Sequence, residues 1–163
     1  MVAATIAMGL IAGFFYAYAC SVMVGLARTD DRTFIAAMQS INATVRNAGF
    51  APSFFGALVL SVTAAGIAVR RRSSTRVPLV VGAGLYAAAF VVTMGFSVPL
   101  NDELAAAGAP DRISDLAAVR DAYEAPWVAW NLVRTALSTG ALVALIVALT
   151  RIRRPDRSRA SAS

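Results

Sequence analysis

The sequence predicts an all-α integral membrane protein: a four-helix bundle with a short amphipathic helix between spans 1 and 2. Hydrophobic residues make up 58% of the 163 residues and charged residues only 15%, whereas soluble domains carry about 25% charged residues. Four stretches approach the roughly 20 apolar residues that cross a bilayer core. We expect one domain, 1–150, with spans at about 2–26, 50–69, 77–98 and 127–150.

The first apolar stretch is uncharged, and no Lys or Arg precedes it, so we expect a spanning helix rather than a signal peptide. Residues 28–47 are polar, but apolar residues recur there at helical spacing. These are Phe34, Met38, Ile41 and Val45. Asp30 or Asp31 is suited to cap the start. The pattern predicts an amphipathic helix.

A second stripe on this helix is polar and consists of Gln39, Asn42 and Arg46. Two interpretations are open. The stripe is either a solvated surface or a partner of polar groups on the last apolar segment.

Proline residues suggest where the later helices begin and end. Pro99 disfavours helical geometry at the residue before it and removes a donor, so we expect an extended or kinked turn that carries Asn101, Asp102 and Glu103. A short helix over about 114–123, capped by Ser114, follows. Pro126 then opens the fourth span in the first-turn position that proline favours.

The distribution of charge predicts the orientation in a cell membrane. The loop between spans 2 and 3 and the tail carry nine Arg against one acid, whereas the other loops carry six Arg against eight acids. Cytoplasmic loops are enriched in basic residues, so both termini are expected in the cytoplasm, with 151–163 as a basic disordered tail. The basic clusters fit membrane lipids better than nucleic acid.

The opening of the fourth span carries polar and aromatic residues on one helical face. Trp127, Trp130, Asn131, Arg134 and Ser138 recur at i, i+3, i+4, i+7 and i+11. With the predicted orientation, the polar groups of the other segments fall at the same, non-cytoplasmic end. They are Gln39, Asn42, Asn47, Asn101 and Asp102.

Two interpretations of this convergence are open. The groups either form a pocket for a hydrophobic small molecule, with aromatic walls that include Phe15, or only close the bundle, with Arg134 paired to Asp102 or Glu103. The chain has no His and one Cys, so we expect no protein-bound metal cofactor. The sequence leaves open whether the protein forms a homo-oligomer.

Four motifs, in order along nearly the whole chain, resemble the signature of the DUF1772 or anthrone oxygenase-like family. They are Gly13-Phe-Phe-Tyr16, Met38-Gln39-x-x-Asn42 with Asn47, Val98-Pro99-Leu100-Asn101 and Trp127-x-x-Trp130-Asn131-x-x-Arg134. Members are small proteins with about four membrane helices, some associated with oxidation of anthrones to anthraquinones without metal or flavin. The resemblance implies a cofactor-independent oxygenase with O2 as co-substrate.

The resemblance also suggests roles for the converging residues. Trp127 and Trp130 would stack on a flat polycycle. Arg134 would stabilise an oxyanion, with Asn131 and Asn101 donating hydrogen bonds. Further substrate contacts are expected from Gln39, Asn42, Asn47 and Phe15, and the base would be Asp102 or Glu103. The alternative is a non-catalytic membrane module that binds a lipophilic ligand or a partner protein.

Overall fold

The computed structural model describes residues 1–45 and 47–152, which form helices and short connections without a strand. Arg46 and the tail 153–163, expected to be disordered, lie outside the described residues. The α-helices are α1 Val2–Ala17, α2 Met23–Leu26, α3 Asp31–Thr44, α4 Ala51–Arg70, α5 Arg76–Val92, α6 Val98–Ala106 and α7 Leu116–Ile152. Two π-helical turns, η1 Tyr18–Val22 and η2 Thr93–Ser97, and a 3-10 turn, η3 Pro110–Arg112, complete the chain.

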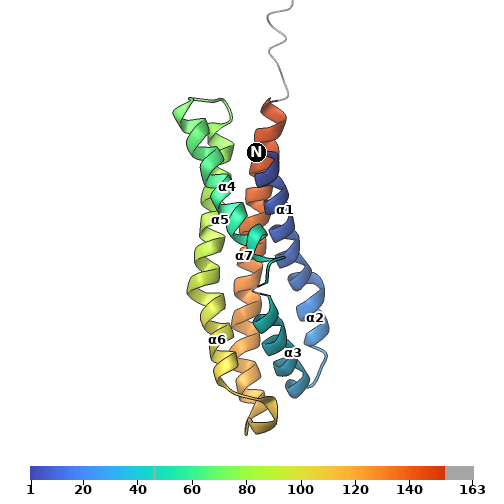
Figure 1. Cartoon of the computed structure of the whole chain (residues 1–163). Coiled ribbons are helices and arrows are strands. Elements are labelled where there is room, and N and C mark those ends of the chain that lie inside the picture. Colours follow the sequence, from blue (N-terminus) through green and yellow to red (C-terminus); the bar gives the residue numbers. More distant parts are fainter. Residues whose placement is uncertain (46, 153–163) are drawn as a thin grey trace, which may run out of the picture.

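Four stretches are long and apolar enough to span a membrane: Val2–Leu26, Ala51–Arg70, Arg76–Ala106 and Leu116–Arg151. The expected all-α, four-helix membrane bundle is confirmed. The N-terminus, the α4–α5 connection and the end of α7 lie at one end of the bundle (Figure 1). The α2–α3 and α6–α7 connections lie at the opposite end (Figure 1).

Helices α3 and α4 follow one another along the bundle. The expected amphipathic helix is confirmed as α3, with Asp30 as its cap, whose carboxylate accepts the Thr33 N–H at 3.0 Å. α3 packs against α6 and α7, whereas α4 packs against α1 and α5. The α3–α4 connection therefore lies part-way along the bundle, not at its end (Figure 1).

The bundle is longer than a membrane is thick. At 1.5 Å per residue the 37 residues of α7 extend about 55 Å, against roughly 30 Å of hydrocarbon. Exposed large hydrophobic side chains run along the first span as far as Val24, continue from Phe55 on α4 to Phe96 in η2, and resume on α7 at Leu132. Within the described part of 25–54 and 98–131 there are none.

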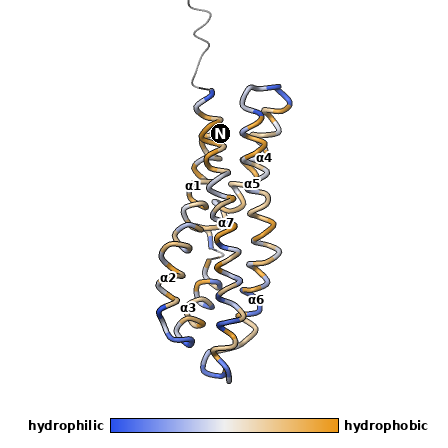
Figure 2. Tube along the Cα trace, turned by 180° about the vertical axis from the view of Figure 1, so that it is seen from behind, coloured by the Kyte–Doolittle hydropathy of each residue, from blue (hydrophilic) through white to orange (hydrophobic). Residues whose placement is uncertain are grey.

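We call the half that exposes these side chains the apolar band. The remainder, α3, α6 and residues 116–131 of α7, is the helical cap. Hydrophilic segments lie at both ends of the bundle, whereas hydrophobic residues dominate along α1, α4 and α5 (Figure 2). Each half has its own buried cluster, one around Met8, Tyr86 and Leu145 and the other around Phe34, Met38 and Trp127.

The two breaks expected at proline residues are wrong. η2 runs directly into α6, and Pro99 is in the first turn of α6. Pro99 lacks a backbone N–H at the point where the π-helical turn, with i+5 hydrogen bonds, gives way to the α-helix, with i+4 hydrogen bonds. Little helical hydrogen bonding is therefore lost. The expected turn after residue 98 is therefore helical.

α7 likewise includes both the expected short helix and the fourth span, with Pro126 inside it. Its start is capped by Asp115 rather than Ser114, because the Asp115 carboxylate accepts the Ala118 N–H at 3.0 Å. Tyr123 and Trp127 are buried on either side of Pro126, and this packing holds the helix together across the missing donor.

Candidate functional site

A cavity of about 410 Å³ lies where the apolar band meets the helical cap, and we call it the main cavity. Its size is that of a typical small-molecule site. Its aromatic lining comes from Phe14, Phe15, Tyr18, Phe50, Phe54, Phe55 and Trp127. The remaining lining residues are Ile41, Asn42, Val45, Ala51, Thr93, Met94, Ser97, Val98, Asn101, Asn131 and Arg134. All four membrane-spanning segments and α3 contribute to it.

Arg134 is the charged residue of this lining, and only 5% of it is exposed. Its guanidinium carbon lies 4.6 Å from the Phe15 ring centre and 5.2 Å from that of Trp127. One terminal nitrogen donates to the side-chain amide oxygen of Asn131 at 3.1 Å, while Nε is buried without a hydrogen-bond partner. Within 1–45 and 47–152, no carboxylate forms an ion pair with Arg134.

Asn131 connects α7 to α1. It is 1% exposed, and its Nδ2 donates to the backbone oxygen of Phe15 at 3.1 Å. That bond uses the amide nitrogen and leaves the amide oxygen directed at Arg134. Asn131 therefore sets the position of the guanidinium in the cavity.

A hydrogen-bonded group of side chains closes the cavity toward the cap. Asn101 on α6 accepts from the Tyr123 hydroxyl at 2.9 Å and from the Trp127 indole at 3.0 Å. Asn42 on α3 donates to the same hydroxyl at 3.1 Å. The group joins α3, α6 and α7.

Beyond this group lies a polar recess of about 250 Å³ on the cap surface. It is lined by Gln39, Asn42, Ala43, Asn101, Asp102 and Ala105. Asn42 and Asn101 line both the recess and the main cavity. The two amides therefore separate an apolar space from a polar one.

The other side of the main cavity opens toward the outside of the apolar band. Phe55 on α4 and Met94 on η2 line the cavity and are 50% and 41% exposed. We call this exposed edge of the cavity the lateral mouth. It lies among exposed side chains that suit hydrocarbon.

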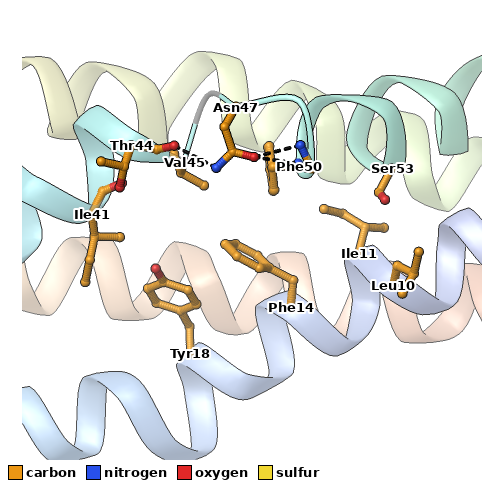
Figure 3. A pocket seen from close by; sticks show the side chains of 11 residues that line it. Leu10, Ile11, Phe14, Tyr18, Ile41, Thr44, Val45, Asn47, Phe50 and Ser53 are labelled. Atoms are coloured by element: carbon orange, nitrogen blue, oxygen red, sulfur yellow. Dashed lines mark hydrogen bonds between the residues drawn. The ribbon is translucent and has the colours of Figure 1, made fainter.

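An outer groove of about 510 Å³ runs between α1 and the α3–α4 connection. Phe14 of α1 and Tyr18 of η1 project into it, opposite Ile41 and Val45 (Figure 3). These four residues and Phe50 also line the main cavity. The groove is thus the outer side of the same aromatic wall.

Six of the predicted site residues line the main cavity: Phe15, Asn42, Asn101, Trp127, Asn131 and Arg134. The structure places the other predicted residues elsewhere. Trp130 stacks on Phe96, with ring centres 4.0 Å apart. Gln39 donates to the carbonyl oxygens of Leu104 and Gly108 at 2.8 and 2.9 Å, and so holds the end of α6.

Asn47 shapes the α3–α4 connection and borders the outer groove (Figure 3). Its amide nitrogen donates to the Thr44 oxygen at 2.8 Å, and its amide oxygen accepts the N–H groups of Gly49 and Phe50. It keeps the turn compact between the two helices. Asn47 is therefore a positioning residue for the wall that Phe50 provides.

The two acids expected as a base do not line the main cavity. Asp102 and Glu103 are exposed on α6, Asp102 at the polar recess and Glu103 at a small groove beside Leu100. α6 is helical where a turn was expected, and successive residues of a helix point about 100° apart. Only Asn101 of the three consecutive residues therefore faces the cavity, and the expected pairing with Arg134 is not found.

Several residues of the site were missed from the sequence: Tyr123 of the hydrogen-bonded group, and Thr93 and Ser97 of the cavity lining. Tyr123 precedes Trp127 by four residues and so shares its face, a signal that was present. Thr93 and Ser97 belong to a π-helical turn, which sequence periodicity does not indicate. Such turns insert one residue into a helix and often lie at functional sites, and both η1 and η2 border the main cavity.

Comparison with known proteins identifies a family. A protein-family model described as anthrone oxygenase matches residues 43–144, more than half of the chain. The matched range runs from the end of α3 into α7 and includes Asn101, Trp127, Asn131 and Arg134. No curated protein and no solved structure matches the chain.

Proposed function

The chain belongs to the anthrone oxygenase family, and we therefore propose that it oxidises a hydrophobic aromatic or quinone-like compound of the anthrone type with O2. The reaction converts an aryl methylene into a carbonyl, so that an anthrone and O2 give an anthraquinone and water. The proposal includes neither metal nor flavin. O2 is the co-substrate.

The observation that supports this proposal best is the composition of the main cavity. A buried guanidinium lies among aromatic rings that suit a flat polycycle. The lateral mouth at Phe55 and Met94 suits a substrate that arrives dissolved in the membrane.

The chemistry begins with loss of a proton from the methylene of the anthrone. Its negative charge is delocalised onto the ring-carbonyl oxygen, where Arg134 would stabilise it. The carbon of this anion bonds to O2, and protonation gives a hydroperoxide. The remaining C–H bond and the O–O bond then break, which leaves the second carbonyl and releases water. In this scheme Asn131 keeps Arg134 in place.

A second candidate function is a membrane module that binds a lipophilic ligand without changing it. One observation favours it: among the described lining residues of the main cavity there is no Asp, Glu or His to act as a base. The ligand would then occupy the same aromatic space. The two functions differ in turnover, not in the site.

Oxygen uptake and quinone formation separate these functions. Detergent-purified protein is mixed with a simple anthrone, with a chelator present, and compared with Arg134→Gln and with Leu132→Ala. Leu132 lies on the same helix but faces the membrane, so its variant is the matched control. We expect turnover above the spontaneous rate for the wild type and control, and its loss in folded Arg134→Gln. If the protein does not accelerate the oxidation of any of several anthrones, the oxygenase is refuted and the binding module is the function that remains.

A further inference from the structure

The charge of Arg134 has no compensation in the described structure. The guanidinium is buried between Phe15 and Trp127, and its polar contact is the neutral amide of Asn131. Ring faces offset only part of the cost of burying a cation. Its Nε is buried without a hydrogen-bond partner, so this guanidinium keeps an unsatisfied donor.

Acids near this end of the bundle are engaged elsewhere. Asp31 and Glu124 both bind Arg120, at 2.9 and 2.6 Å. Asp111 pairs with Arg32. None of these acids lines the main cavity, and neither does Asp102 or Glu103, so the described lining offers Arg134 no negative charge.

Few titratable groups face Arg134 from the elements around it. η1 contributes Tyr18 and α7 contributes Tyr123. From α3, α4, η2 and α6, the described cavity lining contains no titratable side chain. Both tyrosines are neutral at physiological pH in water. A ligand group that ionises beside Arg134 would therefore be the anion of the site.

We propose that the main cavity binds its ligand as an oxyanion, held against Arg134, and that this cation ionises the ligand in place of a carboxylate base. The inference rests on the proposed function for the ring system of the ligand. The oxygen lies at Arg134 and the aromatic body extends toward the lateral mouth. The proton lost by the ligand is released to the surrounding water.

The test uses 2-hydroxyanthraquinone, whose absorbance changes when its phenol ionises, and protein in lipid nanodiscs. The pH of the sample is varied, and the pKa of the bound probe is compared with that in empty nanodiscs. An adjacent cation lowers the pKa of an acid by about 1–3 units, so we expect at least a roughly tenfold larger ionisation constant. At a pH where the phenol is ionised, 2-methoxyanthraquinone, which cannot ionise, should bind more weakly.

Arg134→Gln should abolish the change in probe pKa, and Arg134→Lys should retain part of it because the charge remains. Leu132→Ala should behave as wild type. An unchanged or raised pKa of the bound probe in the wild type would overturn the inference, with no variant needed. So would a lowered pKa that persists in folded Arg134→Gln.

The probe is already a quinone, so its ionisation does not depend on oxygenation. A lowered probe pKa without anthrone oxidation would refute the proposed function and leave the oxyanion site. Anthrone oxidation with an unchanged probe pKa would refute the oxyanion site alone.

Discussion

Arg134 and Asn131 show how one helical face builds the charged centre of the site. In α7, residues 127, 131 and 134 lie within about 40° of one direction, because a residue advances about 100°. Trp130 lies about 60° from Trp127, on the side opposite Asn131, and is therefore at the edge of this face. It stacks on Phe96 rather than entering the cavity. Periodicity therefore predicted the centre of the face correctly, while its edge depended on the neighbouring helix.

The roles of Asn101 and its neighbours on α6 can be separated by substitution. Glu103→Gln should leave anthrone-dependent oxygen uptake within about twofold of wild type, because this carboxylate is exposed outside the main cavity. Asn101→Ala should lower it about tenfold or more, because the Tyr123 hydroxyl and the Trp127 indole lose a part-buried acceptor, at a cost of roughly 1–3 kcal/mol. The measurement is the initial rate in matched preparations.

Thermal unfolding of both variants provides the control, since a change in rate has meaning only for folded protein. A tenfold loss in Glu103→Gln would show that this acid acts in the reaction despite its exposure. It would also remove the reason for placing ionisation under the control of Arg134.

At the scale of elements, the sequence predicted which segments are helical better than where they stop. The amphipathic period of α3 and the long apolar runs rest on burial, which acts over many residues. The expected stops at Pro99 and Pro126 rest on a single missing donor, which packing in the bundle overrides. The π-helical turns change the hydrogen-bond register without changing composition, so no pattern predicted them.

Close packing between α5 and α7 gives a prediction at this scale. A Cβ atom on Gly82 would lie 3.3 Å from both the Ala141 oxygen and the Ala144 Cβ. Gly82→Leu should therefore destabilise the bundle by about 1–3 kcal/mol, measured as a lower midpoint of thermal unfolding in detergent. Gly84→Leu is the matched control, because a Cβ atom added there would meet nothing within 4 Å.

Helix propensity favours Leu over Gly at both positions. A stability change that is equal in the two variants would contradict the packing argument. The difference between them measures how closely α5 and α7 approach.

The whole molecule combines a membrane bundle with a cap that extends beyond it. The sequence predicted four spans and the convergence of polar groups at one end. It did not predict that α3 and α4 follow one another along the bundle, because that depends on where the chain turns in three dimensions. The main cavity forms at this level, next to the α3–α4 connection.

The predicted orientation can be checked with introduced cysteines in a Cys20→Ser background, because Cys20 is the single cysteine of the sequence. Ala106 and Ser74 are exposed, at the cap and in the basic α4–α5 connection. A membrane-impermeant maleimide should label Ala106→Cys on intact cells and Ser74→Cys only after lysis, because basic loops stay in the cytoplasm. The reverse labelling pattern would show that the protein has the opposite orientation in the membrane.

Under the proposed function, the lateral mouth determines which concentration of substrate sets the occupancy of the main cavity. A ligand that enters between Phe55 and Met94 is taken from the lipid, so occupancy follows its mole fraction among lipid molecules rather than its amount per volume of buffer. Diluting the sample with buffer would hardly change the rate for a strongly partitioning substrate. Adding empty vesicles would lower it, because they withdraw substrate from the bilayers that hold the protein. Under the proposed function, the membrane is thus the solvent from which this site takes its substrate.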